Sequence, residues 1–152
     1  MPLNLIIDTE TDETFYDSVR RLLGGVSEID LPNEDILDPT IFDVSELEIL
    51  ELVPCLDDGE LTDAELTKVR LALIHLIASK LCPTMMGRID YEVKTIDVSW
   101  KRKPIDYEDL KNNLLSIVDT LLQGIQCYGV DKDSPIFRVA PSKRKVNESE
   151  KL

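Results

Sequence analysis

Hydrophobic residues recur at helical spacing, every third or fourth position, along most of the chain. This pattern predicts four helices, over residues 12–23, 39–52, 63–81 and 107–126. The third begins at a capping box formed by Thr62 and Glu65, and it is apolar on nearly every side. A helix of that kind lies in the middle of a bundle or between subunits, so the pattern predicts a mainly α-helical bundle.

The other three predicted helices have one apolar face each. In the helix at residues 39–52 this face consists of Ile41, Val44 and Leu47. The helix at residues 107–126, which Asp106 would cap, has the longest stripe: Leu110, Leu114, Ile117, Val118, Leu121 and Ile125. Between the helices we expect a linker with a turn at Pro32-Asn33 and a loop that begins at Pro54.

Residues 88–103 depart from helical spacing. Apolar residues alternate with polar ones as in a strand, and the alternation shifts by one residue at Thr95; the residues are Ile89, Tyr91, Val93, Ile96, Val98 and Trp100. This predicts a short β-hairpin or extended ribbon with a bulge or tight turn. A lone hairpin is barely stable in water, so the ribbon either folds back on its own bundle or contacts another subunit.

The last residues, 131–152, predict a flexible C-terminal arm. One apolar stretch, residues 136–139, lies between two prolines, and the basic cluster Lys143-Arg144-Lys145 follows it. The chain therefore divides into a helical domain, residues 1–130, with the ribbon as an insertion at about 88–103, and the arm. The arm either lies over its own helices or adds a strand to a partner.

Charge is unevenly distributed along the chain. The 152 residues carry a net charge of −13, yet residues 1–67 hold 19 acidic and two basic residues, and the remainder holds 11 acidic and 15 basic ones. We interpret this as an acidic half that repels nucleic acid and a second half that can dock on an acidic surface. A solvated acidic face is the simpler alternative. Lys101-Arg102-Lys103 beside Trp100 is a weak nucleic-acid signal in so acidic a chain.

The three cysteines are Cys55, Cys82 and Cys127, which are far apart and odd in number. They predict reduced thiols in a cytoplasm. No apolar run reaches the roughly 20 residues that span a bilayer, and the N-terminus does not resemble an export signal.

Catalytic and metal-binding signals are weak. The one histidine, His75, lies among leucines and isoleucines and is interpreted as structural. Residues 54–65 resemble a calcium loop only in part, because Pro54 and Leu56 stand where ligand oxygens are needed. Neither a zinc spacing nor a phosphate-binding glycine loop is present. We therefore expect no enzyme activity, no cofactor and no metal.

The order of the helices resembles a known family. The stretches that carry the resemblance are "FYDSVRRLLGGVSEIDLPNEDIL", "LTDAELTKVRLALIHLIASKL" and "PIDYEDLKNNLLSIVDTLLQGI". A short helix with a leucine-proline-acid turn, a capped central helix, an extended excursion and a long amphipathic helix follow one another. Over residues 12–126 the chain resembles the head–tail connector (adaptor) proteins of tailed bacteriophages, which attach beneath the portal.

The resemblance implies a structural virion protein without catalytic activity. It would form a ring, dodecameric to match the portal, assemble in the host cytoplasm and lie in the virion neck, where DNA passes through without specific binding. Its downstream partner would be the next neck or tail protein. The C-terminal segment would bind the portal, through residues Pro135, Ile136, Phe137, Arg138, Val139, Lys143, Arg144 and Lys145.

Two alternatives remain open from the sequence. The nearest is another phage neck or tail-completion protein. The other is a small acidic inhibitor or regulator that binds a host protein or a basic surface.

Overall fold

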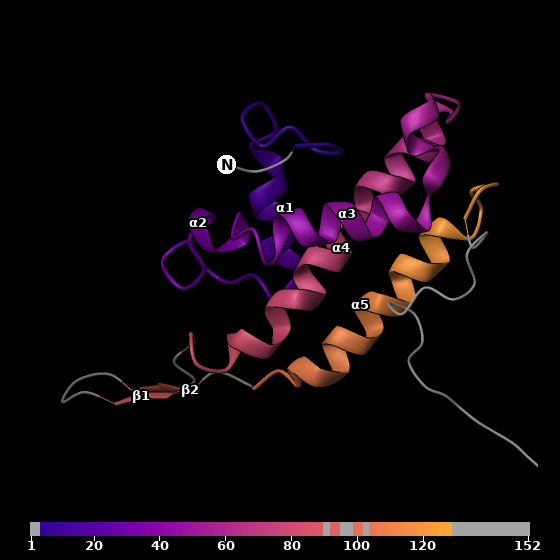
Figure 1. Ribbon diagram of the computed structural model, residues 1–152. Helices are drawn as coiled ribbons and strands as arrows, with labels where there is room; N and C mark the ends of the chain where they lie inside the picture. The colour runs from indigo at the N-terminus through magenta and orange to yellow at the C-terminus, as the bar shows by residue number, and fades with distance from the viewer. Residues whose placement is uncertain (1–3, 90–91, 95–98, 102–103, 129–152) are drawn as a thin grey trace, which may run out of the picture.

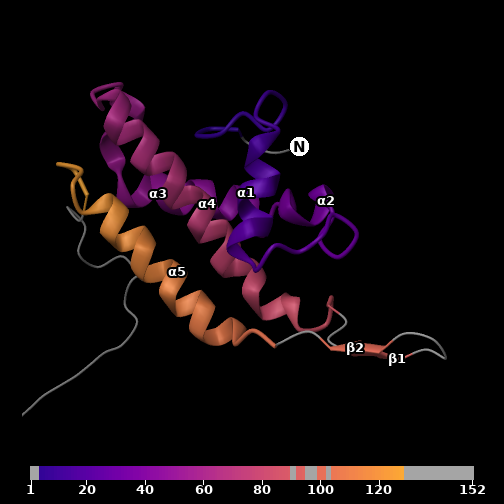
Figure 2. The ribbon, with the colours of Figure 1, turned by 180° about the vertical axis from the view of Figure 1, so that it is seen from behind.

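The computed structural model describes residues 4–89, 92–94, 99–101 and 104–128, and it is mainly α-helical, as predicted. The helices are α1 (Thr14–Leu22), α2 (Asn33–Ile36), α3 (Phe42–Leu52), the 3-10 helix η1 (Pro54–Asp58), α4 (Asp63–Met85) and α5 (Tyr107–Leu122). The longest helix, α4, runs through the middle of the molecule. In both views α5 lies alongside it and antiparallel, whereas α1 and α3 cross its other side (Figures 1 and 2).

The central position of α4 follows from its sequence. Its buried residues point in nearly every direction: Val69, Ala72, Leu73, Ile74, Leu76, Ile77, Ala78, Ser79, Leu81, Cys82 and Met85. The predicted capping box is confirmed, because the Glu65 N–H donates to Thr62 Oγ1 (3.2 Å) and the Thr62 N–H donates to Glu65 Oε1 (3.1 Å). The predicted end at residue 81 is wrong. The helix continues through Pro83 to Met85, because burial of the last turn outweighs the hydrogen bond that a proline cannot donate.

The apolar face predicted for α3 is wrong. Val44 and Leu47 are 39% and 52% exposed, and the buried face carries Phe42 and Ile49 instead. The helix begins at Phe42, whose ring packs edge-on against that of Phe15 in α1, with 5.7 Å between the centroids. This contact fixes the rotation of α3 about its own axis.

The connection between α1 and α3 is more ordered than the predicted linker. It contains the one-turn helix α2, which follows Pro32 and buries Ile36. Leu31, just before it, is also fully buried. These two side chains hold the connection against the bundle.

The stripe predicted for α5 largely forms the interface with α4. Of the predicted residues, Leu114 and Val118 are buried in the helix, but Ile117 is 41% exposed. Leu122, which was not predicted, is buried too. Asp106 caps the helix by accepting from the Asp109 N–H (3.1 Å). The helix ends at Leu122, four residues before the predicted end, and the chain continues in turns to residue 128.

Two short strands lie between α4 and α5 in the sequence. β1 (Glu92–Lys94) pairs antiparallel with β2 (Ser99–Lys101), and Val93 is opposite Trp100. In both views this pair projects beyond the end of the helical body (Figures 1 and 2). Ile89 belongs to neither strand and is buried at the end of the α4 connection.

Candidate functional site

Three basic residues, two on α4 and one just beyond its end, face the acidic half of the same chain. Each forms an ion pair, and the pairs are Arg70 with Asp12, Lys80 with Glu48 (2.9 Å) and Arg88 with Asp35 (2.5 Å). The Thr14 hydroxyl, followed by the Arg70 guanidinium, holds the pKa of Asp12 below its ordinary value. Three bases of the second half therefore contact acids of their own chain. The acidic surface that they bind belongs, in part, to the same molecule.

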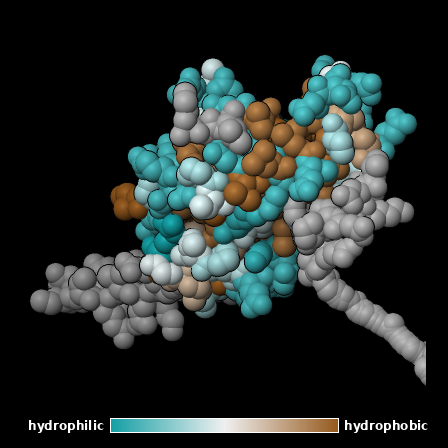
Figure 3. Space-filling view, viewed as in Figure 1, coloured by the Kyte–Doolittle hydropathy of each residue, from teal (hydrophilic) through white to brown (hydrophobic). Residues whose placement is uncertain are grey.

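Most acids of the N-terminal half nevertheless point to solvent. The exposed ones are Asp8, Glu10, Glu13, Asp17, Glu28, Glu34, Asp38, Glu51, Asp57, Asp58, Glu60 and Asp63. Figure 3 shows hydrophilic side chains over both upper ends of one face, with hydrophobic ones between them over the first half of α4. The surface of the helical body is therefore mainly acidic.

A hollow of about 260 Å³ lies beside the first half of α4. It is lined by Ile6, Leu56, Leu66, Thr67, Val69 and Arg70. Of the apolar residues, Leu66 is 43% exposed. This hollow is a small apolar contact surface at the edge of the acidic body.

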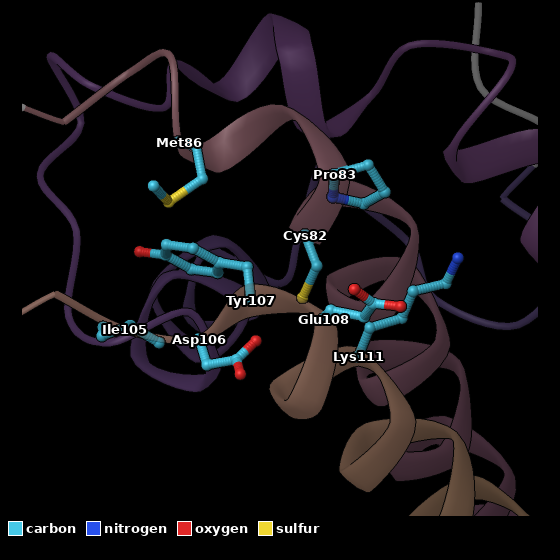
Figure 4. A pocket seen from close by; sticks show the side chains of 8 residues that line it. All are labelled: Cys82, Pro83, Met86, Ile105, Asp106, Tyr107, Glu108 and Lys111. Atoms are coloured by element: carbon cyan, nitrogen blue, oxygen red, sulfur yellow. The ribbon is translucent and has the colours of Figure 1, made fainter.

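A second pocket, of about 490 Å³, lies where the end of α4 meets the start of α5. Its lining comes from both sides: Cys82, Pro83, Met86, Ile105, Asp106, Tyr107, Glu108 and Lys111. Figure 4 shows Met86 and Tyr107 on one side of Cys82, and Glu108 and Lys111 on the other.

The polar groups of this pocket already serve the fold. Burial raises the pKa of the Cys82 thiol to about 11, so at neutral pH it is protonated and a poor nucleophile. The Asp106 carboxylate caps α5, and the Tyr107 hydroxyl donates to the carbonyl oxygen of Leu23 (3.4 Å). The pocket is thus suited to receiving an apolar side chain, and none of its lining groups is an activated nucleophile.

The remaining titratable groups give little further chemistry. His75 is half-buried, and its Nδ1 donates to the carbonyl oxygen of Leu71 (2.7 Å) within α4. In the part of the chain that the structure describes, no group of three or more His, Cys, Asp or Glu side chains could hold a metal ion. Nor does any described helix have the length and apolar character needed to cross a membrane.

The prediction of three reduced thiols is wrong. Cys55 and Cys127 form a disulfide, with their Cα atoms 6.1 Å apart, and Cys82 remains a thiol. The turns after α5 bring Cys127 to η1, where Cys55 lies. Because 72 residues separate the two cysteines, their spacing in the sequence carries no signal of this contact.

Arg20 is a structural residue that the sequence did not single out. It is 7% exposed, and its guanidinium reaches across to the connection before α2. Nε donates to the carbonyl oxygen of Leu31 (3.0 Å), Nη2 donates to Asn33 Oδ1, and Asp17 lies 3.7 Å away. Its neighbour Arg21 is exposed. The two arginines of the acidic half therefore differ in role.

Glu46 is the other missed residue. It is fully buried on α3, and its Oε2 accepts a hydrogen bond of 2.5 Å from the Ile6 N–H of the N-terminal segment. Burial raises the pKa of Glu46 above its ordinary value, although this and neighbouring backbone N–H groups act in the opposite direction. Its spacing from Phe42 and Ile49, four and three residues, would have placed it on the buried face had those two been recognised.

The predicted contact residues are only partly described. Val93 and Trp100 are partners in the register of the two strands. Tyr91, Ile96 and Val98 lie outside the described residues. So do all members of the predicted portal-binding arm: Pro135, Ile136, Phe137, Arg138, Val139, Lys143, Arg144 and Lys145.

Comparison of the chain with protein-family models, with curated protein sequences and with solved structures finds no match.

Proposed function

We propose that this protein is a structural component of a tailed-phage neck, forming a ring under the portal that joins the DNA-filled head to the tail. The observation that carries the proposal is the β1–β2 pair, which extends beyond the helical body (Figure 1). A two-stranded ribbon is marginal in water without a covering surface. A neighbouring copy, or the next protein of the neck, would supply that surface.

The charge of the helical body supports passage of DNA without specific binding. Its exposed acids repel phosphates at separations within the Debye length, which is about 8 Å at physiological salt. The bases Arg70, Lys80 and Arg88 are engaged with acids of the same chain and are not directed at a polyanion. A channel built from such bodies would let DNA slide.

The bases outside these pairs favour contacts between copies. Lys94 and Lys101 belong to the two strands, and Arg102 and Lys103 follow in the sequence. A basic ribbon and an acidic body are complementary, and they are different surfaces of one protomer. That is the requirement for a head-to-tail interface, which generates a ring when the rotation closes.

The C-terminal segment is the proposed portal contact. Burial of Ile136 and Phe137 on the portal would offset the loss of chain entropy on ordering, and the basic cluster at residues 143–145 would bind an acidic patch. The proposal includes no catalytic activity, cofactor or metal.

Coexpression with the portal of the same phage tests the arm. Removing residues 131–152 should abolish ring formation on the portal, measured by native mass spectrometry, and should leave the helical circular dichroism signal intact. The matched control removes only residues 147–152, which keeps the predicted contact residues. Unchanged association of the longer deletion would contradict the arm's role. A small fixed-ratio complex with a host protein in place of a ring would favour an inhibitor.

Serine substitutions test the ribbon. Trp100→Ser combined with Val98→Ser should weaken ring assembly more than it lowers the free energy of unfolding, because a partner covers these residues. Ile29→Ser serves as the control, since Ile29 is 91% exposed at another edge of the molecule. Equal loss of assembly and of folding in the ribbon variant would assign the ribbon to the core of its own protomer.

A further inference from the structure

The Cys55–Cys127 disulfide fastens the chain that follows α5 to η1, just before the start of α4. Cys55 lies in η1, between α3 and α4, and Cys127 lies five residues after the last residue of α5. The bond encloses α4, both strands and α5. Residues 129–152 follow almost at once, so this bond is at the base of the C-terminal segment.

Besides the disulfide, residues 123–128 make hydrogen bonds to nearby residues, including two of 3.0 Å from Gln123 to Asp119. Ile125 is buried, and the Tyr128 hydroxyl donates to Asp119 Oδ1 (2.5 Å). Single-turn backbone bonds of 3.0 Å join Ile125 to Leu122 and Tyr128 to Ile125. By contrast, α5 packs on α4 along its length through the buried residues Leu114, Val118 and Leu122. Opening the disulfide would therefore loosen residues 123–128 while α5 stays in the core.

The two bonded cysteines are more exposed to solvent than the third cysteine. Cys55 and Cys127 are each partly exposed, whereas Cys82 is 1% exposed and its burial raises the pKa of its thiol to about 11. Small thiols in solution can reach the bonded pair, and Cys82 does not compete for it. Asp57 and Asp58 are exposed and follow Cys55 by two and three residues in η1, so they add negative charge to the segment that carries Cys55.

We propose that Cys55 and Cys127 form a reversible redox site that fixes or releases the base of the C-terminal segment. In the closing step, the thiolate of one cysteine attacks a low-molecular-weight disulfide and releases one thiol. The second cysteine then attacks the mixed disulfide, forms the Cys55–Cys127 bond and releases the second thiol. Two electrons and two protons pass from the protein to the reagent. Opening is the reverse reaction with two thiols.

This step rests on the proposed function. In a phage neck, the redox chemistry would make the C-terminal segment bind the portal first and the disulfide close afterwards. The site would be open in the reducing cytoplasm, where the C-terminal segment must find the portal. After release, disulfides of the oxidising medium would close it. The segment would then be fastened to the bundle only after it has bound its partner.

Hydrogen exchange on the isolated full-length chain tests the redox site without a portal. The protein is equilibrated in buffers with defined ratios of reduced to oxidised glutathione. Free thiols are trapped by alkylation and counted by mass spectrometry, which also follows the exchange of amide hydrogens. We expect amides at residues 123–128 to exchange about tenfold faster or more when reduced, and amides in the middle of α4 to be unchanged. Reoxidation should restore the slow rate.

Three results would overturn the proposal. Loss of protection from hydrogen exchange throughout α4 on reduction would show that the disulfide is required for the helical fold itself. Unchanged exchange at residues 123–128 would mean that the bond restrains nothing. Failure of glutathione disulfide or cystamine to re-form the bond would exclude reversibility. Because no portal is present, each of these results leaves the proposed function standing, and failure of portal binding leaves the redox result standing.

Two variants sharpen the test. Cys82→Ser should respond to the redox buffer as the natural chain does, since the buried thiol takes no part. A Cys55→Ser/Cys127→Ser double variant should show the fast exchange of the reduced protein in every buffer, and the reduced natural chain supplies the same comparison should that variant fold poorly. Cationic cystamine should close the site several-fold faster than anionic glutathione disulfide, with the difference shrinking as salt rises.

Discussion

The buried guanidinium of Arg20 makes a sharp prediction, because the chain provides its own control. Arg20 and Arg21 are adjacent in α1 and identical in chemistry, yet the first is 7% exposed and the second is exposed. Arg20→Ala removes the hydrogen bonds to the Leu31 carbonyl and the Asn33 side chain. Arg21→Ala removes a solvated charge.

The expected loss follows from these two bonds. Hydrogen bonds to charged groups contribute about 1.5–3 kcal/mol each, and the alanine also leaves two part-buried acceptors without their donor. Removing a buried charge recovers part of its desolvation cost, which offsets some of the loss. We therefore expect Arg20→Ala to lower the free energy of unfolding by about 3 kcal/mol, and Arg21→Ala by about 0.5 kcal/mol or less.

Urea denaturation followed by circular dichroism measures both variants. Arg20→Lys should fall between them, because one ammonium group cannot reproduce the two-pronged contact of Arg20 with Leu31 and Asn33. Should Arg20→Ala and Arg21→Ala differ by no more than measurement error, the buried guanidinium would not be holding the α1–α2 connection, and the reasoning would be wrong.

Two further substitutions test local contacts. Burial raises the folded pKa of Glu46 above its ordinary 4.5. Between pH 4.5 and that folded pKa the native state binds more protons than the unfolded state, so the stability that this group contributes is lost as the pH rises through this window. Glu46→Gln should therefore stabilise the protein at pH 7, with a gain that disappears below pH 4.5 in denaturation curves; destabilisation at pH 7 would show that Ile6 needs the ionised acceptor. Thr62→Ala should cost about 1 kcal/mol by removing one half of the capping box. The exposed Thr67→Ala should cost clearly less, and equal costs would contradict the role of the cap.

The sequence predicted those features that depend on residues close together in the chain. The four long helices follow from apolar spacing, and the start of α4 follows from the Thr62–Glu65 pair, whose partners are three residues apart. The rotation of α3 does not follow in this way. Val44 and Leu47 on one side compete with Phe42 and Ile49 on the other, and only the packing of Phe42 on Phe15 decides between them.

Contacts distant in the sequence could not be predicted from it. Cys55 meets Cys127 only because the turns after α5 return to η1. Pro83 is itself exposed, but it is tolerated in α4 because Leu81, Cys82 and Met85 around it are buried, which depends on the rest of the core. In both cases tertiary packing overrides a local preference.

The distribution of charge in the folded molecule differs from the distribution along the sequence. Counted along the chain, the second part holds 15 bases against 11 acids, a composition that favours an acidic partner. In the folded molecule its bases at Arg70, Lys80 and Arg88 are paired with acids of the first part, so they stabilise the bundle. The positive charge left for a partner then belongs largely to the strands and to the sequence beyond α5, whereas the body keeps its exposed acids. The ring proposed above depends on this difference, because a head-to-tail contact joins two unlike surfaces, whereas a symmetric dimer joins like ones.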